Sequence, residues 1–258
     1  MRVLFYLAIA LFSMYFLPAC KKQQNVPAAQ TCDLSTSPIT QEYQYDFESE
    51  FLENFENSSR WISQNAVIGM EEGKGVLTAD AENTSNALEA WHLYKVQMPM
   101  NRSWEISAEV TIPLYWNSNG GKKAQVGIGL FVGKPVESGE SSQVYECNFA
   151  CINGKQRFVQ AQLIQNRLGQ DPIDVQFQQI DDNVETLNLK IRYCASYSSI
   201  SLLAAGNQVG DSKPLNKAVS DWNITESGML DIGIMGFAEK TTINENSPTI
   251  DEFKVAIY

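Results

Sequence analysis

The sequence has few of the residues that most catalytic and nucleic-acid-binding sites require. It contains one histidine, His92, and only 19 Lys and Arg residues against 30 Asp and Glu, for a net charge of −11. Nucleic acids and anionic lipid surfaces are bound by basic surfaces, so this balance argues against both partners. A Gly-x-Ser-x-Gly elbow, a metalloprotease His-Glu pair and a phosphate-binding glycine loop are all absent. We therefore expect no nucleic-acid partner and a structural role for His92.

Long apolar runs are also lacking, apart from residues 3–17 behind Arg2. This run is shorter than the roughly 20 residues that span a bilayer, and it is typical of a secretory signal. Its end, Leu17-Pro18-Ala19-Cys20, resembles the signal of bacterial lipoproteins, which implies cleavage after Ala19 and lipidation of Cys20. We expect a lipid-anchored protein of the bacterial cell envelope, in the periplasm or at the cell surface, whose only membrane contact is its acyl chains. An ordinary signal peptide with an incidental Cys20 is the alternative.

Helical periodicity is missing, whereas alternation of apolar and polar residues recurs along the chain. Asn153-Gly154 lies between two such segments and is a strong hairpin signal. These patterns predict an all-β, two-sheet antiparallel sandwich at residues 43–258, behind a signal peptide (1–19) and a flexible tether (20–42). The alternating or strand-like segments are 43–47, 104–112, 126–132, 145–152, 157–165, 173–177, 187–193, 200–204, 230–237 and 253–257.

Both ends of the expected domain resemble concanavalin A-like (laminin G-like) jelly-roll domains. The resemblance is carried by Tyr45-Asp46-Phe47-Glu48, Trp61, Gly75-Val76-Leu77 and the closing Thr249-Ile250-Asp251-Glu252-Phe253-Lys254-Val255. It implies a jelly-roll sandwich with a curved sheet whose concave side carries carbohydrate in exported bacterial relatives.

Aromatic residues beside amides suggest where a sugar could bind. A sugar ring has apolar faces and hydroxyl edges, so its site needs a ring platform and a few polar groups. Tyr115, Trp116 and Asn117 enter a glycine-containing turn, and Trp91 lies in a second aromatic cluster. We take these four as candidate glycan-binding residues, with burial in the core as the alternative for each ring.

Glu105 and Glu109 lie on one face of a strand and offer an enzymatic alternative. Glu105-Ile-Ser-Ala-Glu109 resembles the Glu-Ile-Asp-Ile-Glu strand of laminarinase-type β-glucanases, which implies a nucleophile at Glu105 and an acid/base at Glu109. Ser107 replaces the central Asp of that motif. A solvated outer face explains the same two residues without catalysis.

The resemblance also implies a structural calcium between the first and last strands. Asp46, Glu48 and Asp251 would supply its oxygen ligands. Plain surface acids are the alternative.

Four cysteines follow Cys20, and export favours their oxidation. Cys147 and Cys151 lie about 13 Å apart if they share a straight strand, which is beyond disulfide distance. We therefore predict that one of them pairs with Cys194 and that Cys32 fastens the tether to the domain. Zinc is disfavoured because the ligand spacing is poor.

The favoured hypothesis is a membrane-anchored lipoprotein that binds glycan without catalysis. The alternatives are a glycoside hydrolase or lyase that uses Glu105 and Glu109, and a structural envelope lipoprotein without a small ligand.

Overall fold

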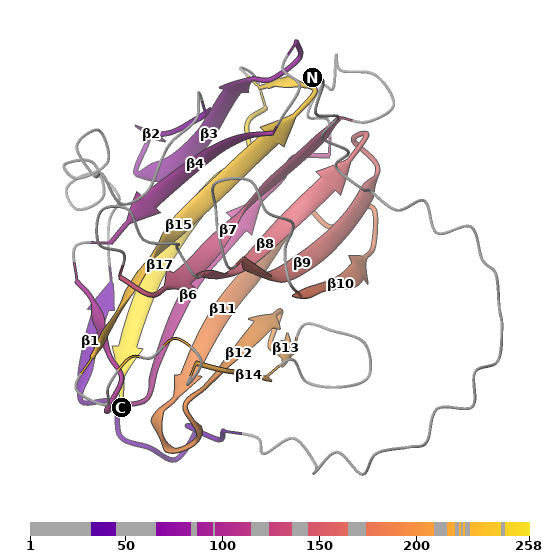
Figure 1. The fold of residues 1–258 in the computed structure, drawn as a ribbon. Helices are drawn as coiled ribbons and strands as arrows, with labels where there is room; N and C mark the ends of the chain where they lie inside the picture. The colour runs from indigo at the N-terminus through magenta and orange to yellow at the C-terminus, as the bar shows by residue number, and fades with distance from the viewer. Residues whose placement is uncertain are drawn as a thin grey trace, which may run out of the picture. The chain divides into compact units, whose positions relative to one another are not determined.

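Two antiparallel sheets make up the part of the chain that the computed structural model describes (Figure 1). That part comprises residues 32–44, 66–83, 87–94, 96–114, 124–135, 144–164, 174–208, 216–219, 222, 224, 228–243 and 246–258. The all-β, two-sheet antiparallel sandwich expected from the alternation is confirmed.

Ten strands form one sheet, with the main order β13-β12-β11-β6-β17-β3-β16. Beside this path β1 pairs with β17, β14 with β12 and β2 with β3. A short 3₁₀ helix, η1 (Ala195–Tyr197), connects β11 to β12. The strands are β1 (Gln41–Gln44), β2 (Ala66–Glu71), β3 (Lys74–Asp80), β6 (Trp104–Thr111), β11 (Thr186–Cys194), β12 (Ser199–Ala204), β13 (Asn207–Gln208), β14 (Asn216–Ala218), β16 (Thr242–Ile243) and β17 (Thr249–Ile257).

Seven strands form the second sheet, in the order β10-β9-β8-β7-β15-β4, with β5 beside β15. Its central strands β7 and β8 lie against β6 and β11 of the ten-stranded sheet. The strands are β4 (Leu88–Leu93), β5 (Met98–Pro99), β7 (Gln125–Gly133), β8 (Val144–Ile152), β9 (Gln156–Ile164), β10 (Asp174–Ile180) and β15 (Met229–Glu239).

The core lies between the sheets and is lined by every second residue of the facing strands. Ile106 and Ala108 of β6 and Ile128 and Leu130 of β7 have no exposed surface. Burying an isoleucine or leucine side chain contributes about 1.5–3 kcal/mol. Their alternation therefore decides which face of each strand turns inward.

The hairpin predicted at Asn153-Gly154 joins β8 to β9. Both turn residues have positive φ, 53° at Asn153 and 66° at Gly154, as a type I′ turn requires. The amide of Lys155 closes the turn by donating to the carbonyl of Ile152 at 3.0 Å.

The folded unit begins at Cys32, which corrects the predicted tether of residues 20–42. β1 pairs with β17, the last strand, and Leu34 is buried. Thr40 donates its amide to the carbonyl of Ile257 at 2.8 Å. These contacts with the far end of the chain attach a polar segment that has no periodicity of its own. Residues 20–31 lie outside the described part.

Candidate functional site

Several residues predicted to act lie outside the described residues. These are Cys20, Asp46, Glu48, Tyr115, Trp116 and Asn117. Lipidation at Cys20 and ring stacking at Trp116 therefore stay predictions. The described residues contain no helix long and apolar enough to cross a membrane.

Trp91 lies on β4 and is not a surface platform, contrary to the prediction. Its side chain is 0% exposed, and its ring packs edge-on against Phe131 at 5.0 Å between centroids. The indole N–H donates to a carboxylate oxygen of Glu89 at 3.0 Å. Met235 faces Trp91 across the strands and belongs to the same small apolar cluster. The ring thus packs within the protein and offers no exposed face to a sugar.

The disulfide joins Cys32 to Cys194, with 6.0 Å between their Cα atoms. Cys32 does fasten the N-terminal segment to the domain, as predicted. The predicted pairing of Cys194 with Cys147 or Cys151 is wrong, because both lie buried on β8 of the other sheet and neither is disulfide-bonded. Burial raises the pKa of the Cys147 thiol, so it stays protonated.

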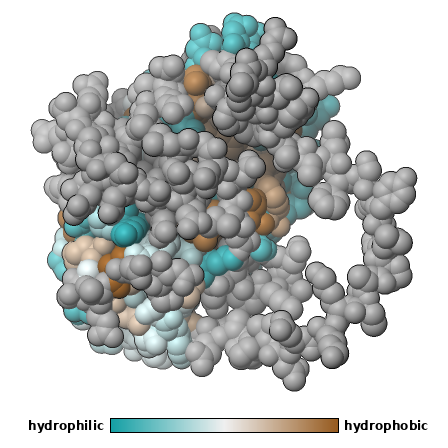
Figure 2. Space-filling view, in the orientation of Figure 1, coloured by the Kyte–Doolittle hydropathy of each residue, from teal (hydrophilic) through white to brown (hydrophobic). Residues whose placement is uncertain are grey.

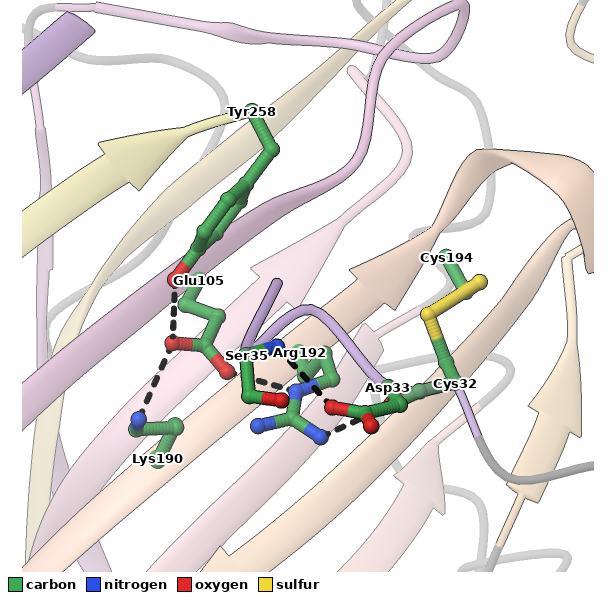
Figure 3. A network of polar contacts seen from close by, with 8 residues as sticks. All are labelled: Cys32, Asp33, Ser35, Glu105, Lys190, Arg192, Cys194 and Tyr258. Carbon is green, nitrogen blue, oxygen red and sulfur yellow. Dashed lines mark hydrogen bonds and ion pairs between the residues drawn. A yellow bond between two sulfur atoms is a disulfide. The ribbon is translucent and has the colours of Figure 1, made fainter. Parts of the chain in front are cut away.

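Glu105 is the centre of a polar network on the outer face of the ten-stranded sheet (Figure 3). Its carboxylate accepts hydrogen bonds from Lys190 Nζ at 2.9 Å, Arg192 Nε at 2.5 Å and the Tyr258 hydroxyl at 3.0 Å. Arg192 also donates through Nη1 to the carbonyl of Cys32 at 2.9 Å. The network therefore continues the attachment of the N-terminal segment beside the disulfide.

The pKa values in this network follow from burial and charge. Burial alone would raise the pKa of Glu105, but the hydrogen bonds and charges of Lys190 and then Arg192 outweigh it, so the pKa is lowered. Burial, and then the negative charge of Glu105, raise the pKa of Tyr258 to about 12. The network thus holds an ionised carboxylate and a neutral phenol at neutral pH.

The structure does not assemble Glu105 and Glu109 as a catalytic pair. They share one face of β6, four residues apart, so spacing alone would allow a pair; the hydrogen bonds of Glu105 decide against it. Both carboxylate oxygens of Glu105 are already hydrogen-bonded, and Glu109 faces Asn188 and Asp251 in the register. The contacts of Glu105 join β6 to β11 and to Tyr258.

This network predicts how stability changes in acid. Because the folded pKa of Glu105 lies below its ordinary value of 4.5, its contribution to the free energy of unfolding is present above that pH and is lost as the pH falls through the folded pKa. We expect Glu105→Gln to flatten the acid limb of urea-unfolding free energy measured between pH 7 and pH 3. Glu109→Gln, on the same strand, is the matched control and should keep the wild-type slope. Equal slopes for Glu105→Gln and wild type would contradict the assignment.

Asp251 is the only described member of the predicted calcium ligands. Its Oδ2 pairs with Lys74 Nζ at 3.3 Å, and its Oδ1 accepts the amide of Glu252 at 2.7 Å. Within the described ranges, no three His, Cys, Asp or Glu side chains gather closely enough to hold a metal ion. Calcium binding with Asp46 and Glu48 stays a prediction.

The outer face of the seven-stranded sheet carries a polar cluster that the motifs did not indicate. Gln162 and Gln160 of β9 lie directly across from Glu146 and Asn148 of β8. Glu146 and Asn148 are buried and the two glutamines are half-buried. We call these four residues the amide relay.

The hydrogen bonds of the amide relay run in one direction, from Gln160 as donor through Gln162 to the carboxylate of Glu146 as final acceptor. Glu146 Oε1 accepts from Asn148 Nδ2 at 3.2 Å and from Gln162 Nε2, while Gln162 Oε1 accepts from Gln160 Nε2 at 2.6 Å. An ionised carboxylate can only accept, so Gln162 must present its N–H to Glu146 and its oxygen to Gln160. This order also determines which atoms of Gln160 are left to face outward.

Two phenylalanine rings lie beside the outer end of the relay. Phe177 on β10 is directly across from Gln160 and is 55% exposed. Phe158 on β9 packs edge-on against it, with 5.5 Å between the ring centroids and 66° between the ring planes. In Figure 2 apolar and hydrophilic residues adjoin on the surface where Figure 1 draws β9 and β10.

A sequence signal for this site exists, but it does not identify a site by itself. Residues 156–162 alternate Gln and Phe with apolar or charged residues, and residues 175–179 place Phe177 among glutamines. The alternation predicts that Phe158, Gln160 and Gln162 share a face. The pairing with β8 and β10, which makes this face a site, is a tertiary feature.

Comparison with known proteins gives similarity to solved structures alone. No protein-family model and no curated protein matches the sequence. Solved structures with a similar backbone include the potassium-bound carbohydrate recognition domain of Emp46p (14% identity, TM-score 0.47, covering 78% of this chain and 88% of that chain). Others are lectin II from Ulex europaeus (11%, 0.46, 85% and 99%) and a legume lectin-like domain from Entamoeba histolytica (10%, 0.43, 76% and 87%). At these values the likeness concerns the arrangement of strands and assigns no ligand to this chain.

Proposed function

We propose that this protein binds a neutral carbohydrate, without catalysis, on the outer face of the seven-stranded sheet at β9 and β10. One observation carries the proposal: the exposed ring of Phe177 lies directly across from Gln160, whose amide is oriented by the relay to Glu146. A ring platform next to preset amide groups matches the apolar faces and hydroxyl edges of a sugar. The net charge of −11 favours a neutral over an anionic ligand.

Binding is favoured over hydrolysis by the arrangement of the acids. Glu105 is held by Lys190 and Arg192 on the ten-stranded sheet, whereas the amide relay lies on the seven-stranded sheet. The amide relay contributes one carboxylate, Glu146, whose Oε1 accepts hydrogen bonds from two amides. The amide relay therefore offers hydrogen-bonding groups for binding a ligand and no second carboxylate for hydrolysis.

The cellular setting is part of the same proposal. Residues 3–17 and Cys20 would direct export and lipid anchoring, with the domain on the exported side of a bacterial membrane. Tyr115, Trp116 and Asn117 could add a second aromatic contact to the ligand, and a structural calcium could join Asp46, Glu48 and Asp251.

A glycan-array screen of the purified protein, reading both retention and released sugar, tests this function. We expect retention without release. Phe177→Ala should lower the affinity for the retained glycan at least about fivefold, because stacked rings contribute about 1 kcal/mol beyond area burial. Tyr197→Ala removes another exposed aromatic, on η1, and is the matched control. Repeating the screen with added calcium and with EDTA tests whether glycan retention depends on the proposed structural calcium.

Three outcomes would redirect the proposal. Sensitivity to Trp116→Ala but not to Phe177→Ala would move the site to residues 115–117. Sugar release that Glu105→Gln abolishes would support the hydrolase. If no neutral glycan on the array is retained or cleaved, the result would favour an envelope protein without a small ligand.

A further inference from the structure

Resting on the proposed function, we infer that the ligand is a linear glycan of at least two rings that lies along β10. One ring stacks on Phe177, and Gln179 contacts the next ring along the chain. The relevant positions are Val175, Phe177 and Gln179, which share the outer side of β10. Alternate residues of a strand are about 6.6 Å apart, so these positions extend over about 13 Å.

The accessible surface is narrow across the strands. Opposite the three β10 residues lie Gln162, Gln160 and Phe158 of β9, one strand spacing of about 4.8 Å away. The next strand, β8, presents Glu146 and Asn148, which are buried. Phe158 is buried as well, so the side chains that a ligand can reach are the three of β10 with Gln160 and Gln162 beside them, a strip about 13 Å long and one strand spacing wide.

Such a strip is longer than one sugar ring. A pyranose ring is about as large as the phenyl ring of Phe177 and would cover the middle of the strip. Neighbouring rings of the same chain would then lie over Gln179 in one direction and over Val175 and Gln162 in the other. A straight strip along a strand suits a linear chain.

Hydrogen bonds from its side chain to backbone carbonyls orient Gln179 for this contact. Its Nε2 donates to the carbonyls of Arg157 at 2.9 Å and Ile180 at 3.2 Å. The side-chain nitrogen is thereby held against the strands, and the exposed side chain presents its oxygen as an acceptor for a hydroxyl group. Phe177 is held similarly by the edge of Phe158.

The test is a length series, from monosaccharide to hexasaccharide, of the neutral glycan that the array identifies, measured by titration calorimetry on the purified protein. We expect at least a tenfold gain in affinity between the monosaccharide and the trisaccharide. Gln179→Ala should lower the trisaccharide affinity about fivefold and change the monosaccharide affinity less than twofold. Phe177→Ala should weaken both, and Tyr197→Ala should weaken neither.

The outcomes separate this inference from the proposed function. Equal affinity for the monosaccharide and the longer chains, with loss on Phe177→Ala, would overturn the inference and leave the function standing. Equal loss of monosaccharide and trisaccharide affinity on Gln179→Ala would also overturn it. Binding of no neutral glycan at any length would overturn both. Thermal melting of each variant confirms that it is folded, and Gln179, being exposed, gives a variant that does not disturb the core.

Discussion

Replacing Cys32 and Cys194 with serine is expected to lower the free energy of unfolding by about 3–5 kcal/mol. The two residues are 162 positions apart, so the disulfide closes a loop that includes most of the chain. In the chain-entropy account, opening a loop of this length returns about 5 kcal/mol of conformational freedom to the unfolded state. Loss of the bond also frees the segment that leads through buried Leu34 to β1. The effect is large against the 5–15 kcal/mol that stabilises a typical domain.

Urea unfolding with and without a reductant measures this effect. Reduced wild type and the oxidised double variant should unfold at the same urea concentration, well below oxidised wild type. The double variant should not respond to the reductant, which shows that the reductant acts through this bond. A difference below 1 kcal/mol between oxidised and reduced wild type would contradict the prediction.

Arg157→Met should lower the free energy of unfolding by about 3–5 kcal/mol. Arg157 is fully buried, and its guanidinium donates to three backbone carbonyls: Ile112 at 2.6 Å, Pro113 at 2.8 Å and Val184 at 2.9 Å. Methionine keeps much of the side-chain volume and leaves these carbonyls without their charged donor. Each such loss costs about 1–3 kcal/mol.

The planar fork of the guanidinium makes this position specific for arginine. Because a lysine ammonium is a point donor, Arg157→Lys should recover only part of the loss. Lys155→Met, at the exposed turn of the same hairpin, is the control and should stay within about 0.5 kcal/mol of wild type. Urea unfolding followed by tryptophan fluorescence measures all three variants. A loss below 1 kcal/mol for Arg157→Met would show that these carbonyls find other donors.

Arg157 also connects the candidate site to the rest of the sandwich. It begins the pairing of β9 with β10, opposite Ile180, and its own carbonyl accepts the side chain of Gln179. The carbonyls that it binds follow β6 and precede β11 of the other sheet. Its inward side chain therefore fixes the strand that presents Phe158, Gln160 and Gln162 outward.

Local patterns were enough to predict several of the longer strands and their inward faces. The alternation in residues 104–112 and 126–132 became β6 and β7, and Asn153-Gly154 became the turn between β8 and β9. These features depend on neighbours two residues apart or on the backbone preferences of a single turn. Such short-range information is present in the sequence itself.

Motif and spacing were not enough to place the functional residues. Trp91 is an aromatic residue of the type that stacks on sugars, yet it is buried in a cluster with Phe131 and Met235 of other strands. Glu105 has the spacing of a catalytic acid, yet Lys190 and Arg192 of β11 hold it as a structural ion. The cysteines allowed several pairings that only their positions in space could decide.

The sequence by itself determined the fold class, the alternation of buried and outward residues and the acidic character of the chain. Only the tertiary structure decided that Cys32 meets Cys194, that Glu105 meets Arg192 and that Gln160 lies between Asn148 and Phe177. The physical reason is that alternation sets the face of a side chain, whereas its neighbours on that face depend on strand order and register. Both are settled by packing among residues far apart in the chain.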